Sequence, residues 1–473
     1  MSRRSANAAI SVLGLSSQQL ASLIVTFLAA GVLGPADYGV YVIATVFVEL
    51  VIALTYTGYF HFLVTVSEDE AEAALPTLFW LMVAIGAAGG AALWLAAPGL
   101  ARLFDAPELA PVLRAFGAMQ PFASAVGWAS AVLTREGRMR RYFLALAGAN
   151  LGGLAGGAAV LLAWPSLQAL VLYRAIRLAL GLALFLPAAR HRPRLRFDPA
   201  LARRATGYAA GLYGARLMAF VAHFGTDLLL GLVFSTAEAG LYRFANRLAA
   251  AAVDVIGHPV RSFALTRFGA AARAGTPLGP VLAQSLATGV FLMGGFAIAV
   301  AGLGRTVTEV LFRPEYLAAL PAFYALALRA AATAGTQLVE PVFAARARTR
   351  VAMGFDMAWA SAMIAAIAWA APLGLAPLAW AQAAVGVGGA VAALWTIGRW
   401  GGVPLEQALA RTGPALGLLA LYGGALALLW PPLQALAEGP ARLALGLALA
   451  AGMAAPVCWI ALRRGVLDMR LFD

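Results

Sequence analysis

The chain has 473 residues, of which 62% are hydrophobic and only 12% are charged, and its mean hydropathy is +0.83. A soluble domain usually has about 25% charged residues, and a soluble protein of this length could not bury so large an apolar fraction. The composition therefore excludes a soluble enzyme, a disordered protein and a DNA-binding module, and it predicts a polytopic membrane protein. All 34 basic residues are Arg, and with 21 acidic residues they give a net charge of +13. We interpret this excess of Arg as a topology signal rather than as a sign of nucleic-acid binding.

Long apolar segments follow one another along the whole chain and predict an all-α fold with about 14 transmembrane helices. The first of them continues directly into the second, so we interpret it as an uncleaved helix and not as a signal peptide. Only Pro372–Pro377 separates the eleventh span from the twelfth, which leaves 13 spans as an alternative. The expected spans are residues 8–33, 39–66, 75–97, 111–134, 142–164, 167–189, 207–234, 239–263, 281–304, 319–345, 351–373, 375–398, 413–436 and 441–462.

The arginines alternate between loops in the way that the positive-inside rule requires. With the N-terminus in the cytoplasm, 22 of the 34 Arg fall in inner segments and 6 in outer segments or at the outer ends of spans. One inner loop, Ser67–Glu72, reads SEDEAE and has no Arg. Acidic residues count little in this rule, so we predict a multi-pass protein of the bacterial inner membrane with both termini in the cytoplasm.

A basic linker near the middle of the first twelve spans divides the chain into two six-helix lobes. This linker, Arg190–Thr206, reads RHRPRLRFDPALARRAT and is the longest inner segment. We therefore predict an N-terminal lobe at 1–189, a cytoplasmic linker at 190–206, a C-terminal lobe at 207–398, and two additional helices with a tail at 399–473.

Three matches between the lobes predict a parallel internal repeat. PADYGVY at Pro35–Tyr41 matches TAEAGLY at Thr236–Tyr242 at an offset of 201 residues. LFDAPEL at Leu103–Leu109 matches LFRPEYL at Leu311–Leu317 at an offset of 208. The basic inner loops at 135–141 and 346–350 occupy the same place in each lobe. Transporters often bind substrate at the interface of such repeats.

Two motifs also resemble a known family. LGPADYGVY at Leu33–Tyr41 and the Arg-rich loop LTREGRMRRYF at Leu133–Phe143 are similar to segments of Wzx-type polysaccharide and oligosaccharide flippases, which belong to the multidrug/oligosaccharidyl-lipid/polysaccharide exporter superfamily. The sharp match covers about 20 residues, whereas the length and the 6+6+2 arrangement match throughout. The resemblance implies two lobes around a central cavity. It also implies translocation of a polyprenyl-pyrophosphate-linked oligosaccharide for lipopolysaccharide or other cell-surface polysaccharide biosynthesis.

Four arginines lie deep inside predicted spans, where a charge costs at least about 2.5 kcal/mol. They are Arg174, Arg177, Arg216 and Arg329. Each is too far from a span end to reach the interface easily, so we expect them to face a wet cavity; a structural ion pair is the alternative. Arginine suits a pyrophosphate because its planar donors match phosphate oxygens.

Polar residues at helical spacing extend these positions into stripes on several spans. In the seventh span the stripe includes Asp227, and in the eighth it includes Asp254. Spans 1 and 4 carry amides where the repeat places Arg216 and Arg329. The predicted substrate-binding residues are Arg174, Arg177, Arg216, Arg329, Arg243, Arg247, Gln19, Gln120 and Gln337.

Four acidic residues within the spans have two open interpretations. Glu49, Asp227, Asp254 and Glu340 either neutralise arginines or carry a coupling ion, H⁺ or Na⁺. The sequence has one Cys and no GxxxxGK[ST] motif, so we predict neither a metal site, nor a bound cofactor, nor ATP hydrolysis.

Two other functions remain as alternatives. A drug/cation antiporter of the same superfamily requires cavity acids, whereas the deep charges here are mainly Arg. A membrane-embedded enzyme acting on lipid-linked sugar usually needs sizeable catalytic loops, and every predicted outer loop is short. We therefore predict a non-enzyme without catalytic residues that binds a lipid-linked anionic oligosaccharide and membrane lipids but no nucleic acid. It is expected to function as a monomer beside a glycan polymerase and glycosyltransferases.

Overall fold

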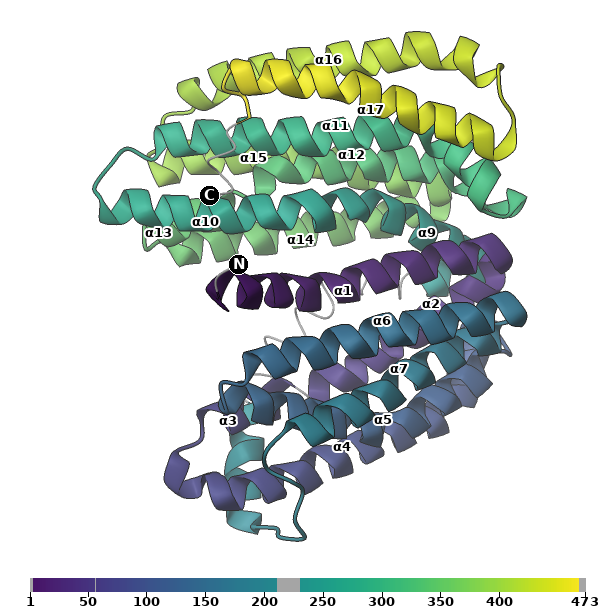
Figure 1. Ribbon diagram of the computed structural model, residues 1–473, viewed down its shortest axis with the longest axis vertical. Coiled ribbons are helices and arrows are strands. Elements are labelled where there is room, and N and C mark those ends of the chain that lie inside the picture. Colours follow the sequence, from purple (N-terminus) through teal and green to yellow (C-terminus); the bar gives the residue numbers. More distant parts are fainter. Residues whose placement is uncertain (1–2, 56, 211–229, 468–473) are drawn as a thin grey trace. The chain divides into compact units, whose positions relative to one another are not determined.

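The computed structural model describes residues 3–55, 57–210 and 230–467, and these residues are almost entirely helical (Figure 1). They divide into two compact units, Met1–Arg243 and Phe244–Asp473. The boundary lies inside one continuous helix, α9 (Thr236–Ala252), and the basic linker belongs to the first unit. The finer division into lobes of six helices with two additional helices stays a prediction.

The first unit contains seven labelled helices before the basic linker. The fourth and the fifth pack so closely that their backbones touch, because a Cβ added to Gly117 would lie 2.6 Å from the carbonyl oxygen of Gly90. Small residues permit this approach in lipid, where van der Waals packing holds helices together. The helices are α1 (Arg3–Val32), α2 (Pro35–Thr55), α3 (Thr57–Thr65), α4 (Glu68–Leu103), α5 (Leu109–Arg135), α6 (Met139–Ala163) and α7 (Leu167–Ala188).

The second unit repeats the helix pairings of the first. In the first unit α4 packs on α5, α5 on α7, and α6 on α7; the corresponding pairs here are α11 with α12, α12 with α15, and α14 with α15. After α9 come η1 (Val253–Gly257), α10 (His258–Arg273), α11 (Gly279–Leu311), η2 (Pro314–Ala319), α12 (Leu320–Thr336), α13 (Val339–Ala345), α14 (Thr349–Ala370), η3 (Ala371–Leu373), α15 (Leu375–Gly401), α16 (Glu406–Gln434) and α17 (Gly439–Arg463). The last two lie side by side and pack on α11 (Figure 1).

The first repeated motif forms a close helix crossing. Gly39 of α2 and Gly240 of α9 occupy the same position in PADYGVY and TAEAGLY. A Cβ on Gly39 would overlap the carbonyl oxygen of Thr236, and a Cβ on Gly240 would overlap that of Pro35. Because Pro35 and Thr236 also match in the repeat, the contact has approximate two-fold symmetry. The glycines are therefore required by the close approach of the two backbones.

Ten helices or helix pairs of the described chain are long and apolar enough to span a membrane, so the protein is a multi-pass membrane protein. The predicted all-α polytopic fold is confirmed, but the number 14 is not. The expected spans on α1, α5 and α9 are not among these ten, and α9 itself has only 17 residues. Most of the seventh expected span lies outside the described residues.

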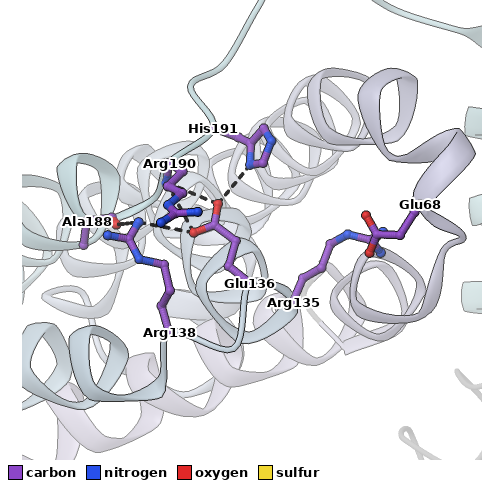
Figure 2. Close-up of polar contacts among 7 residues, drawn as sticks. All are labelled: Glu68, Arg135, Glu136, Arg138, Ala188, Arg190 and His191. Carbon is purple, nitrogen blue, oxygen red and sulfur yellow. Dashed lines mark hydrogen bonds and ion pairs between the residues drawn. The ribbon is translucent and has the colours of Figure 1, made fainter.

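The start of the basic linker is held by the loop after α5 (Figure 2). Glu136 accepts hydrogen bonds from the Arg190 backbone N–H at 3.2 Å and contacts His191 Nδ1 at 2.9 Å, and Arg138 lies 3.3 Å from the same carboxylate. Burial raises the pKa of the Glu136 carboxyl, but hydrogen bonds from His191, Arg138 and the Arg190 backbone outweigh it and hold that pKa below its usual value. The carboxylate therefore stays charged and ties the linker to the loop after α5.

The acidic segment SEDEAE was expected as a loop but forms the N-cap and first turns of α4, and its glutamates pair with arginines from elsewhere in the first unit. Arg204 forms two hydrogen bonds with Glu70, at 2.6 and 3.2 Å. Arg135 lies 3.0 Å from Glu68, as Figure 2 shows. This pairing explains why a segment without Arg is tolerated on the side that the arginine count assigns to the cytoplasm.

Candidate functional site

A polar pocket of about 360 Å³ lies inside the first unit, between α1, α2, α5, α6 and α7. Two of the predicted arginines line it, together with two of the other predicted residues, Glu49 and Gln120. Arg174 and Arg177 reach it because they are three residues apart on α7 and so share one face of the helix. Its polar lining residues include Gln18, Glu49, Gln120, Ser124, Ser130, Tyr142, Asn150, Arg174 and Arg177.

Arg177 is held by a neutral relay of hydrogen bonds. Its Nε donates to Asn150 Oδ1 at 2.9 Å, Asn150 Nδ2 donates to Ser17 Oγ at 3.0 Å, and Ser17 Oγ donates to the carbonyl of Gly14 at 2.7 Å. Asn150 is 1% exposed, so this relay is shielded from its surroundings. The backbone of α6 comes close enough because Gly153 faces the Arg177 side chain. The partners orient the guanidinium without cancelling its charge.

Arg174 has one acidic neighbour at the limit of an ion pair. Its Nη2 lies 3.5 Å from Glu49 Oε1, and its Nη1 lies 3.5 Å from Thr45 Oγ1. The guanidinium carbon is also 5.0 Å from the centre of the Phe116 ring, a cation–π distance. These contacts are long for charge-assisted hydrogen bonds. Arg174 is therefore positioned more by packing than by a tight salt bridge.

Arg329 is a deep arginine of the second unit, and it is also held by amide side chains. Its Nη1 donates to Gln382 Oε1 at 3.0 Å, and its Nη2 donates to Asn246 Oδ1 at 2.6 Å. Gly386 gives α15 room to pack on this arginine, since a Cβ there would lie 2.8 Å from Arg329 Cγ. Both of these partners are neutral amides. Among the described residues, therefore, no acid is seen to neutralise the charge of Arg329.

The other predicted binding residues are spread over several elements. Gln120 lines the pocket and donates to the Phe116 carbonyl on its own helix at 3.0 Å, whereas Gln19 is exposed on α1. Gln337 ends α12 beside Gly257 of the π-helical turn η1. Arg243 and Arg247 lie on α9, on either side of the unit boundary. Arg216 lies outside the described residues.

The four acids have different surroundings. Glu49 neighbours Arg174 at the pocket, and Glu340 is paired with Arg261. Asp227 lies outside the described residues, and Asp254 belongs to η1, with its side chain undescribed. Within the described residues there is no group of three or more potential metal ligands. The role of these acids in ion coupling, and the absence of a cofactor, stay predictions.

Sequence reasoning missed the amide residues that hold the arginines. Asn150, Asn246 and Gln382 each accept a hydrogen bond from a deep Arg. A signal was present, because the chain contains only three Asn and two of them lie in predicted spans. Gln382 also follows Arg174 by 208 residues, the offset of the second repeat match.

Comparison with known proteins identifies the family. A family model described as "Polysaccharide biosynthesis protein" matches residues 28–321, which is more than half of the chain. The chain belongs to this polysaccharide biosynthesis family. The predicted resemblance to polysaccharide exporters is thereby confirmed.

One relative and two solved structures agree with that assignment. The succinoglycan biosynthesis transport protein ExoT of Rhizobium meliloti (strain 1021) is 24% identical over 306 residues, which are 63% of this chain and 60% of the relative. The lipid II flippase MurJ in an inward closed conformation has a TM-score of 0.73 at 12% identity, covering 97% of this chain and 100% of MurJ. An inward-facing multidrug resistance MATE transporter of the MOP superfamily has a TM-score of 0.63 at 13% identity, covering 82% of this chain and 98% of that one. At these identities the structures establish the fold alone, a MurJ- and MATE-like membrane transporter fold.

Proposed function

We propose that the protein is a flippase that moves a polyprenyl-pyrophosphate-linked oligosaccharide across the bacterial inner membrane by alternating access. The observation that carries this proposal is the pairing of deep arginines with neutral amides. Arg177 and Arg329 have amide partners that orient the guanidinium and leave its charge available. A site built only for structural stability would favour acidic partners, because an uncompensated charge within a membrane is costly.

The ligand chemistry follows from the residues around these cations. Guanidinium groups bind phosphate oxygens with paired, charge-assisted hydrogen bonds. Gln18, Gln120 and Ser124 in the same pocket offer the amides and the hydroxyl that sugar hydroxyl groups need. An anionic head group with attached sugars therefore suits this pocket better than a cationic drug does. The family supports the same class of substrate.

In this proposal the substrate enters from the cytoplasm, both termini lie on that side, and the chain itself carries out no chemical reaction. The alternation of the two halves exposes the arginines to one side at a time. Coupling to H⁺ or Na⁺ through Glu49, Asp227, Asp254 or Glu340 is part of the same proposal. Reporter fusions test the orientation, and a C-terminus outside the cytoplasm would contradict it.

The decisive experiment replaces the deep arginines together. The variant R174A/R177A/R216A/R329A should lose glycan export in cells at matched membrane abundance, because each lost charged hydrogen bond costs about 1.5–3 kcal/mol. R114A is the matched control, since Arg114 lies over the Trp94 ring at 5.7 Å, on α5 but outside the pocket. Unchanged export in the fourfold variant would refute the electrostatic head-group model. R177K should be intermediate, because it keeps the charge and loses the planar donors.

A further inference from the structure

An apolar groove of about 860 Å³ runs between α14 and α15 in the second unit. Its walls are aromatic and aliphatic, and its floor includes two glycines, Gly354 and Gly388, whose Cβ positions would meet no atom within 4 Å. Trp395, at 57% exposure, forms part of the rim. The open space is therefore a property of the helix pair and is not filled by neighbouring side chains of the unit.

The corresponding helix pair of the first unit, α6 and α7, packs through a row of glycines. Along α6, Gly148, Gly152, Gly153 and Gly157 all face side chains of α7 at less than 3 Å from a Cβ built on them. The glycines of α6 thus bring the two helices together, whereas in the second unit Gly389 contacts Trp359 of α14 but Gly354 and Gly388 face open space. The pairing of α6 with α7 thus recurs as that of α14 with α15, but α14 and α15 are further apart along the groove.

Arg348 lines one end of this groove, and two more arginines lie within two residues of it in the sequence. Arg346, Arg348 and Arg350 are exposed within five residues, and Arg348 Nη1 donates to the Trp400 carbonyl at 2.8 Å, which connects the start of α14 to the end of α15. Arg348 also lines the groove. Among the described residues none of the three pairs with an acid, unlike Arg135 and Arg138 in the matching loop of the first unit, which do. The end of the groove is therefore cationic and unneutralised.

The length of the groove corresponds to one membrane leaflet. Its α14 lining extends from Val351 to Ala362, which is about 17 Å at helical rise. Half of a hydrocarbon core of about 30 Å is about 15 Å. An acyl chain of a phospholipid fits this length, whereas a polyprenyl chain is much longer than one leaflet.

We propose that the groove binds one anionic phospholipid of the leaflet next to Arg348, with an acyl chain between α14 and α15 and the phosphate at Arg346, Arg348 and Arg350. In the proposed orientation this is the cytoplasmic leaflet. Basic pockets between transmembrane helices on that side suit acidic lipid head groups. The site does not depend on the identity of the transported substrate, so its test does not use export.

The test measures lipid retention by the full-length chain in detergent with native mass spectrometry. Phosphatidylglycerol should be retained in preference to phosphatidylethanolamine, and R348A should weaken phosphatidylglycerol retention about fivefold, the effect expected of one arginine near a membrane surface. G388L should abolish retention by filling the groove, while the control G417L, at an equally open glycine of α16, should leave it unchanged. G354L provides a second filling variant if G388L is poorly folded.

Three results would overturn the proposal. They are equal retention of the two phospholipids, retention unaffected by G388L and G354L, and displacement of phosphatidylglycerol by polyprenyl phosphate at equal concentration. A diazirine-labelled phosphatidylglycerol locates the bound lipid, and its crosslinks should map to residues 348–362 and 385–400. Crosslinks confined to other helices would also overturn the proposal.

Discussion

The two units each carry a deep arginine, but on helices that do not correspond in the repeat. In the first, the cation Arg174 is on α7 and the amide Gln120 is on its neighbour α5; in the second, Arg329 is on α12 and the amide Gln382 is on its neighbour α15. Arg174 matches Gln382, and Gln120 matches Arg329, at offsets of 208 and 209 residues. At these two matched positions the repeat keeps one cation and one amide and exchanges their places, while Arg177 adds a further cation on α7. This indicates that a charge at that depth matters more than the helix that carries it.

The largest expected effect comes from moving the cation of the second unit. R329Q should lower export about ten- to a hundredfold, since a charged hydrogen bond is worth about 1.5–3 kcal/mol. R329Q/Q382R restores a cation on α15, as Arg174 is placed on α7, and should recover a large part of that export. The control Q382R alone places two cations side by side and should not exceed the wild type. If R329Q/Q382R is no more active than R329Q, position matters and the exchange of places has no functional meaning.

Asn150 separates orientation of the cation from its charge. N150A leaves Arg177 Nε without its partner and should lower stability by about 1–3 kcal/mol, a fall of a few degrees in Tm for each kcal/mol. N150D keeps an acceptor but neutralises Arg177, so we expect Tm near the wild-type value together with reduced export. Thermal unfolding and export are measured on the same membranes. An N150D variant with full export would show that the charge of Arg177 is dispensable.

A smaller effect on the protein is expected from changing Glu136, which is not part of the cation and amide exchange between the two units. Its folded-state pKa is below the unfolded value of about 4.3, so the stabilisation is present above that pH and is lost as pH falls through the folded pKa. At neutral pH, E136Q should release the segment at Arg190 and His191, which limited proteolysis detects as faster cleavage there. E72Q is the matched control, because Glu72 and Arg194 form an exposed pair, and such pairs contribute at most about 1 kcal/mol. Equal cleavage of the two variants would contradict this role of Glu136.

Apolar periodicity predicted most of the helices, because burial in lipid constrains every residue of a span. The helices α1, α5 and α9 were expected as spans but are not among the ten helices that are long and apolar enough. The repeat revealed the shared motif that contains Gly39 and Gly240, but it did not predict that the two copies touch. The contact between Gly39 and Thr236 depends on how α2 and α9 pack. Arg174, Arg177 and Gln120 line the pocket of the first unit, and their role in substrate binding stays a prediction. Asn150 and Gln382 were not, since nothing in a single sequence shows which amide faces a given arginine.

The pairing of the acidic segment with the linker has a consequence for biogenesis. Topology is decided while the chain enters the membrane, when loop arginines act as unpaired charges and acids count little. Arg204 is bound to Glu70 only after both segments have emerged and folded, since 134 residues separate them. In the proposed orientation Arg204 therefore has two roles. It first helps to retain the linker in the cytoplasm, and it later pairs with Glu70 of SEDEAE. R204E would thus disturb insertion and folding at different times during synthesis, and these two defects should be separable in pulse-labelled membranes.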